Sequence, residues 1–257
     1  MRDVLGLART PRGMAERLAT ALLAQDPRVA RTPDGRWTLV GADPSPALDA
    51  CRFAVVDVEA TGASPATGGR LIEVAVVELP PGGAAARLVL ETLVDPERPI
   101  APAVARLTGI TDALVRGAPR FVAVADRLTA ALSGAVFVAH HVQFDWGFVA
   151  AELARARALV LAGPRLCTVR LARRLLPPLA SRSLDALAAY FGFTLGRRHR
   201  AAPDAFAAAR ILAELLALAR ARGALTLTDV LALRPARPGR PARPARRPGA
   251  AAAAPPS

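Results

Sequence analysis

The chain has 257 residues, of which 53% are hydrophobic, and its 34 basic and 21 acidic residues give a formal net charge of +13. The high apolar content excludes a chain that is disordered throughout. Two cysteines far apart in the sequence, Cys51 and Cys167, exclude a disulfide-rich scaffold. Because Met1 does not begin a secretory signal and no uncharged apolar run reaches about 18 residues, we expect a cytoplasmic protein that does not enter the membrane.

The N-terminal residues 1–48 are nearly neutral and predict a small helix-plus-hairpin extension. Residues 15–24 have a helical composition, and residues 31–40 carry a Pro-Asp-Gly turn between two short strand-like runs. The combination is similar to a fragment of a winged-helix module. A docking extension of the main domain is an equal alternative.

The central residues 52–222 have the pattern of an α/β domain. Strands are predicted at residues 53–58, 71–79, 88–94 and 135–139, and helices at residues 119–132, 146–157, 169–175, 184–191 and 204–221. Three successive strands followed by alternating helix and strand favour a mixed sheet flanked by helices.

The C-terminal residues 234–257 form a tail rich in arginine, proline and alanine. It contains six arginines and no acid. Since such a composition cannot bury a core, we expect the tail to be disordered. It is either a solvated end or a non-specific electrostatic tether to nucleic acid. All 34 basic residues of the chain are arginine, and there is no lysine or asparagine. This composition indicates a mutational bias in codon usage as much as a selected charge, which weakens the tether interpretation.

Two acids lie on one face of the first central strand, F-A-V-V-D-V-E-A-T-G. The two-residue period of a strand places Asp57 and Glu59 on the same side as Phe53 and Val55. Burying two unpaired carboxylates there is costly. A solvated edge strand or pairing with arginine would relieve the cost, and so would a hard divalent metal ion.

Two further segments place acids and histidines at helix starts. In A-H-H-V-Q-F-D-W, Asp145 follows a buried strand, and in R-H-R-A-A-P-D-A, His199 stands five residues before Asp204. Taken singly, both acids are ordinary helix-capping residues and the histidines His140 and His141 are polar strand-end residues. Four acids and one histidine at strand ends and helix starts form a constellation, and we expect them to act together.

These segments resemble the three motifs of the DEDDh 3′–5′ exonucleases, a family with the ribonuclease H-like fold that includes the proofreading subunit of bacterial replicative DNA polymerase and ribonuclease T. The family motif D-x-E-T-T-G is similar to D-V-E-A-T-G, H-N-x-x-F-D to H-H-V-Q-F-D, and H-R-A-x-x-D-A to H-R-A-A-P-D-A. The resemblance covers residues 52–221 and implies a five-stranded mixed sheet. It implies four metal-binding acids and one catalytic histidine, which are Asp57, Glu59, Asp145, Asp204 and His199.

The activity implied by the resemblance is metal-dependent hydrolysis of DNA or RNA from the 3′ end. Two Mg²⁺ or Mn²⁺ ions held by the four acids would stabilise the displacement, and His199 would be the general base. The product would be a nucleoside 5′-monophosphate. We expect the neighbouring arginines Arg197, Arg198 and Arg200 to bind the phosphate backbone.

The residues that the resemblance assigns to the terminal nucleotide depart in part from the family pattern. Four positions are expected to bind it: Ala60, Thr61, His141 and Phe144. Ala60 stands where the family has threonine, and His141 where it has asparagine. Cys167 stands where the family often has aspartate, and we expect that change to be structural.

The expected partners are single-stranded or 3′-frayed nucleic acid and a DNA polymerase or repair protein. No segment resembles a sliding-clamp peptide, so a stand-alone or accessory enzyme is favoured over a dedicated polymerase subunit. The alternative is a catalytically weak nucleic-acid-binding or polymerase-accessory module of the same fold. A zinc protein is disfavoured because three histidines and two cysteines show no zinc-ligand spacing.

Overall fold

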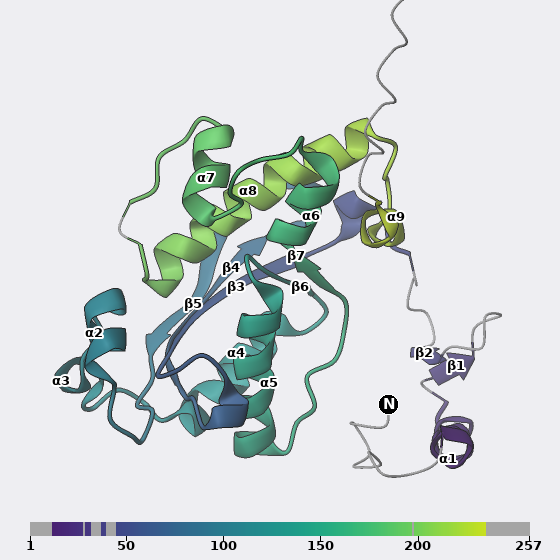
Figure 1. Ribbon diagram of the computed structural model, residues 1–257. Coiled ribbons are helices and arrows are strands. Elements are labelled where there is room, and N and C mark those ends of the chain that lie inside the picture. The colour runs from purple at the N-terminus through teal and green to yellow at the C-terminus, as the bar shows by residue number, and fades with distance from the viewer. Residues whose placement is uncertain (1–11, 28, 32–36, 40–44, 197, 235–257) are drawn as a thin grey trace, which may run out of the picture.

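The computed structural model describes residues 12–27, 29–31, 37–39, 45–196 and 198–234 (Figure 1). The predicted Pro-Asp-Gly turn and all but the first residue of the predicted tail lie outside these ranges. In the N-terminal segment, α1 (Arg12–Leu23) begins three residues earlier than predicted, and β1 (Val29–Arg31) pairs antiparallel with β2 (Trp37–Leu39). No helix of the described ranges is long and apolar enough to cross a membrane.

A mixed five-stranded sheet forms the centre of the molecule, in the order β5-β4-β3-β6-β7. Its strands are β3 (Phe53–Ala60), β4 (Leu71–Leu79), β5 (Arg87–Leu93), β6 (Val136–Ala139) and β7 (Arg165–Cys167). The first three pair antiparallel, and β6 and β7 are parallel to β3. The predicted mixed sheet is confirmed, and the fifth strand is one that the sequence pattern did not locate.

Helices cover both faces of this sheet (Figure 1). One face carries α6 (Thr168–Leu175), α7 (Leu184–Tyr190), α8 (Ala201–Ala221) and α9 (Leu227–Ala232). The other face carries α4 (Phe121–Leu132) and α5 (Val142–Arg157). The shorter helices α2 (Pro102–Thr108) and α3 (Asp112–Val115) pack near Ile72 at the start of β4. Single 3₁₀ turns lie at Leu48–Ala50, Pro65–Thr67 and Pro81–Gly83.

The central strand β3 divides its side chains between the two cores as its two-residue period predicts. Phe53 and Val55 are buried in the core that includes α8, whereas Val56 and Val58 are buried in the core that includes α4 and α5. Asp57 therefore continues the α8 side of β3, at the end of the strand where the apolar core stops. The same alternation of side chains that buries the apolar residues of β3 also places Asp57 and Glu59 on the face of the sheet that α8 covers.

Two helices begin earlier than their patterns suggest, and this changes the place of their acids. The helix α5 begins at Val142 with His141 as its N-cap, so Asp145 lies inside the first turn. The helix α8 begins at Ala201, and Asp204 is likewise within its first turn. The interpretation of Asp145 as an N-cap residue is therefore wrong. Both acids lie where the helix dipole favours negative charge.

Candidate active site

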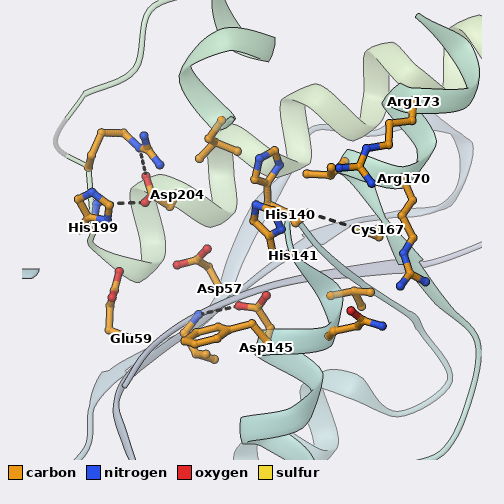
Figure 2. A pocket seen from close by; sticks show the side chains of 17 residues that line it. Asp57, Glu59, His140, His141, Asp145, Cys167, Arg170, Arg173, His199 and Asp204 are labelled. Atoms are coloured by element: carbon orange, nitrogen blue, oxygen red, sulfur yellow. Dashed lines mark hydrogen bonds and ion pairs between the residues drawn. The ribbon is translucent and has the colours of Figure 1, made fainter. Parts of the chain in front are cut away.

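A cavity of about 620 Å³ opens where β3 and β6 end and α5 and α8 begin (Figure 2). Parallel strands bring their carboxyl ends to one edge of a sheet, and side chains that follow them meet there. All five residues expected to be catalytic line this cavity: Asp57, Glu59, Asp145, His199 and Asp204.

The acids of the cavity come from the strand β3 and from one helix on each face of the sheet. Asp57 and Glu59 are contributed by β3, on the side of the sheet that α8 covers. Asp145 is contributed by α5 and is only 4% exposed. Its Oδ1 accepts a hydrogen bond from the backbone N–H of Val58 at 3.2 Å, which fixes the start of α5 against the strand. Asp57, Asp145 and Asp204 all line the same cavity (Figure 2).

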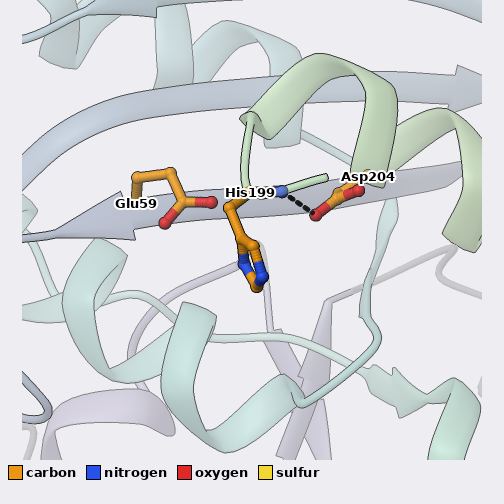
Figure 3. Close-up of side chains that lie close together, drawn as sticks. All are labelled: Glu59, His199 and Asp204. Carbon is orange, nitrogen blue, oxygen red and sulfur yellow. Dashed lines mark hydrogen bonds between the residues drawn. The ribbon is translucent and has the colours of Figure 1, made fainter. Parts of the chain in front are cut away.

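His199 lies in the loop that leads into α8 and is held there by Asp204. The carboxylate of Asp204 accepts a hydrogen bond from the backbone N–H of His199 at 3.1 Å. His199 has φ +58°, in the left-handed region that a non-glycine residue rarely adopts. Ligand atoms of Glu59, His199 and Asp204 all lie within 4.8 Å of one another (Figure 3). This cluster can hold a metal ion.

The electrostatics of the cavity disfavour the ionised carboxylates. Burial raises the pKa of Asp57 well above its ordinary range, and the charges of Asp145 and Glu59 raise it further. Burial also raises the pKa of Asp145 to about 8. Burial and the neighbouring Glu73 raise the pKa of Glu59 to about 7. Since like charges close together cannot all ionise cheaply, the site favours a cation.

Arg198 is the arginine nearest to these acids, and it is already paired. Its Nε donates to Asp204 Oδ1 at 2.9 Å, and its Nη1 donates to Asp185. The expectation that Arg198 and Arg200 bind a phosphate backbone stays a prediction, and in this structure Arg200, like Arg198, is engaged in an ion pair. Arg197 lies outside the described residues.

A buried ion pair that the motifs did not reveal holds the loop of His199 to the sheet. The Glu73 side chain is 1% exposed, and its carboxylate accepts hydrogen bonds from Arg200 Nη2 at 2.6 Å and Nε at 3.0 Å. The backbone N–H of Ala201 donates to the same carboxylate at 2.8 Å. Glu73 lies directly opposite Glu59 in the β3–β4 register. The signal that could have revealed it is an acid within the largely apolar strand β4, which also contains Glu78.

His140 and Cys167 line the cavity, and their side chains are engaged in hydrogen bonds with neighbouring residues. The Nδ1 of His140 is 2.8 Å from Thr168 Oγ1, and burial lowers the pKa of His140 to about 4, which keeps the ring neutral. The Cys167 thiol donates to the His140 carbonyl oxygen at 3.2 Å. Cys167 thus connects β7 to the end of β6.

The four residues expected to bind the terminal nucleotide fall into two pairs. His141 and Phe144 are exposed and line the cavity, with the Phe144 ring 4.9 Å from that of Phe148. Ala60 and Thr61 do not line it. The Ala60 side chain is buried in the core of the opposite face, and the Thr61 hydroxyl accepts a hydrogen bond from the Arg70 N–H at 3.0 Å.

Comparison with known proteins agrees with this arrangement. A family model described as an exonuclease matches residues 54–212, which is more than half of the chain. The chain belongs to the DEDDh family of exonucleases. Asp57, Glu59, Asp145, Asp204 and His199 all lie within the matched residues.

Relatives of this DEDDh chain include much longer proteins. It is 36% identical over 190 residues to a DNA polymerase III subunit epsilon-like protein of Rhodobacter capsulatus, covering 72% of this chain and 26% of that protein. It is 35% identical over 165 residues to the 3′-5′ exonuclease DinG of Bacillus subtilis, covering 64% and 18%. The chain therefore spans about a quarter or less of the length of these relatives.

Solved structures of DEDDh enzymes share the fold. Exonuclease X in complex with 5′ overhanging duplex DNA matches with a TM-score of 0.50 and 26% identity, covering 65% of this chain and 91% of that one. The nuclease domain of 3′hExo bound to rAMP matches with a TM-score of 0.53 and 19% identity, covering 65% and 92%. The second likeness concerns the fold alone.

Proposed function

We propose that the chain is a metal-dependent 3′–5′ exonuclease that hydrolyses the terminal phosphodiester bond of a DNA strand and releases a nucleoside 5′-monophosphate. The observation that carries this proposal is the convergence of four carboxylates and His199 on one cavity. The strand β3 and two helices on opposite faces of the sheet contribute the four carboxylates, and a purely structural role would not require their convergence. RNA is the alternative substrate.

The residues of the cavity fit two divalent cations, Mg²⁺ or Mn²⁺. The donors are carboxylate oxygens, which these hard ions prefer. The raised pKa values of Asp57, Glu59 and Asp145 indicate that the site lacks enough positive charge to stabilise its ionised form. We assign the metal-holding role to these three acids and Asp204. When bound, two such ions stabilise the attacking and leaving oxygens of a phosphoryl displacement.

His199 is proposed as the general base. A neutral imidazole has a nitrogen that can accept the proton of the attacking water. The hydrogen bond from its backbone N–H to Asp204 places the ring beside the carboxylates. Phe144 and His141 are proposed to contact the terminal nucleotide from the α5 side of the cavity. Ala60 and Thr61 would contribute through their backbone groups, since their side chains face elsewhere.

DNA is the preferred substrate in this proposal because the names of the similar proteins refer to DNA. They include a polymerase III epsilon-like protein and polymerases of the PolC type, and Exonuclease X is described with duplex DNA. We propose single-stranded or 3′-frayed DNA as the binding partner. A DNA polymerase or repair protein is proposed as the protein partner.

The test is the release of mononucleotides from a 3′-labelled strand by Asp57→Ala and His199→Ala. We expect both variants to lose activity by at least about a hundredfold, with Glu214→Ala on the exposed side of α8 as the control. Substrates are single-stranded DNA, duplex DNA with a 3′ mismatch, and RNA, each with Mg²⁺ or Mn²⁺. Retained activity in either variant would contradict the site assignment.

A catalytically weak module of the same fold is the second candidate, favoured by Ala60 and His141 at positions where the family has other residues. Isothermal titration with Mn²⁺ separates the two candidates. Binding that is abolished by Asp57→Ala and kept by His199→Ala supports the enzyme. A protein that binds no Mn²⁺ supports the module.

A further inference from the structure

Arginines gather at one end of the cavity and continue into a second one. Figure 2 shows Arg170 and Arg173 at the end opposite to His199. A smaller cavity of about 170 Å³ adjoins this end and adds Arg165 and Arg174 to the lining. The two cavities share four lining residues: Val142, Gln143, Cys167 and Arg170. We call the combined feature the arginine groove, defined by Arg165, Arg170, Arg173 and Arg174.

No carboxylate of the described part of the chain forms an ion pair with an arginine of the arginine groove. Within the described ranges, several other arginines form ion pairs with carboxylates, but none of the four in the groove does. Arg165 instead lies over the Trp146 ring at 4.7 Å, and Arg174 Nη1 donates to the Leu231 carbonyl oxygen at 3.1 Å. The helix α6, which carries three of the four, contains no acid.

The spacing of these arginines suits an extended polyanion. Arg170, Arg173 and Arg174 stand at i, i+3 and i+4 of α6, so they share one helix face with about 5–6 Å between neighbouring Cβ atoms. Guanidinium groups bind phosphate through paired N–H donors. The start of α5, which lies between the groove and the acids, adds the positive end of a 16-residue helix.

We infer that the arginine groove binds the phosphodiester backbone of the nucleotides that precede the 3′-terminal one. This inference rests on the proposed function, which places the terminal phosphodiester bond at the acids. The strand must then leave the acidic end of the cavity. Among the residues that the structure describes, Arg198 is the only other arginine that lines either cavity, and it is neutralised by Asp204 and Asp185. The groove therefore offers the uncompensated positive surface that the upstream phosphates require.

The test compares Arg170→Gln/Arg173→Gln with the charge-matched control Arg127→Gln/Arg210→Gln. Arg127 and Arg210 are exposed and line neither cavity. Two substrates separate upstream binding from chemistry: a single strand of about 15 nucleotides and the p-nitrophenyl ester of thymidine 5′-monophosphate, which has no upstream nucleotides. For the groove variant we expect kcat/KM to fall about tenfold or more on the strand, mostly through KM, and less than threefold on the ester.

Binding of a labelled strand without metal gives an independent readout. The logarithm of affinity falls with the logarithm of salt concentration by about 0.7 per phosphate contact on a single strand. We therefore expect the slope of the groove variant to be smaller by about 1.4, and that of the control to be unchanged. If the wild-type protein cleaves neither substrate, the proposed function is refuted. If the groove variant still has the smaller salt slope in that case, the inference that the groove binds the phosphodiester backbone stands.

Three outcomes would overturn the inference. One is equal loss in the groove variant and the control. Another is an equal loss on the strand and on the ester, which would indicate damage to the cavity itself. The third is unchanged strand binding and cleavage in the groove variant, which would leave the groove to an acidic protein partner instead.

Discussion

Asp145 has one of the most enclosed carboxylates of the cavity, and its ionisation is coupled to folding. Its pKa is raised to about 8, from an ordinary value of 3.8, mainly by burial. The folded metal-free protein therefore holds a proton on this group at pH values where the unfolded chain has released it. A bound cation would displace that proton, because metal ligands must be deprotonated.

We predict that the free energy of unfolding of the metal-free protein falls as pH rises from about 4 to about 8. In this window the folded state binds more protons than the unfolded state, so stability decreases with pH. At about 1.4 kcal/mol for each pKa unit, the rise from 3.8 to about 8 sets an upper limit of about 6 kcal/mol on the contribution of Asp145 to this fall. Urea unfolding in the presence of a chelator, followed across this pH range, measures it.

The control is Asp145→Asn, which keeps an oxygen to accept the N–H of Val58 but cannot ionise. Its stability should depend less on pH than that of the wild type. Mn²⁺ should restore wild-type stability at pH 8 and leave the variant less changed. Parallel pH curves for the two proteins would show that Asp145 is not the group responsible.

At the residue scale, the motifs predicted which side chains meet but not which arginines are free. Asp57 and Glu59 lie near the C-terminal end of β3, and Asp145 follows the C-terminal end of β6, which is parallel to β3. Arg200, however, pairs with Glu73, which is 127 positions away in the sequence. Such a partner depends on the packing of α8 on β4, which local pattern does not encode.

At the scale of elements, the loop into α8 owes its position to two buried carboxylates. Asp204 holds the backbone of His199 from within the helix, and Glu73 holds Arg200 and Ala201 from the sheet. Because a left-handed residue such as His199 persists only where its surroundings fix it, we expect the Glu73–Arg200 pair to position the proposed general base.

We predict that Glu73→Gln lowers kcat on the nitrophenyl ester about tenfold or more and stability by about 2–3 kcal/mol. The catalytic loss would follow from a displaced His199, since small misplacements of a catalytic group are costly. The loss of stability would follow from weakening a charged hydrogen-bond cluster around a buried group. Steady-state kinetics and urea unfolding give the two values.

Glu78→Gln is the matched control at the other end of the same strand. The Glu78 side chain is also buried and pairs with Arg52 at 2.7 Å and Arg87 at 2.8 Å. It should lose similar stability with kcat little changed. If both variants lose kcat equally, the pair at Glu73 has only a structural role.

Element prediction succeeded where the pattern was long and failed where elements were short. The nine residues of β4 form a nearly continuous apolar run, and the 21 residues of α8 carry leucines at helical spacing. The three residues of β7 and the four of α3 are too short for a period to emerge. Pairing with β6 defines β7 as a strand, so its existence depends on tertiary contacts.

At the scale of the whole molecule, the charge is concentrated at the C-terminal end of the sequence. Residues 235–257 contain five arginines and no acid. We predict that their removal lowers the salt slope of single-strand binding by about 0.7 for each arginine that contacts phosphate. Ester hydrolysis and the unfolding midpoint should not change. A truncated protein with the full slope would exclude a tether role.

The cavity also depends on the whole molecule, because its acids belong to different layers. β3 supplies two of them, α5 supplies Asp145 from one face, and α8 supplies Asp204 from the other. A chain that has docked only one layer on the sheet holds an incomplete set of ligands. Metal binding would therefore require that both helical layers are docked, so a bound cation would couple the two faces of the sheet.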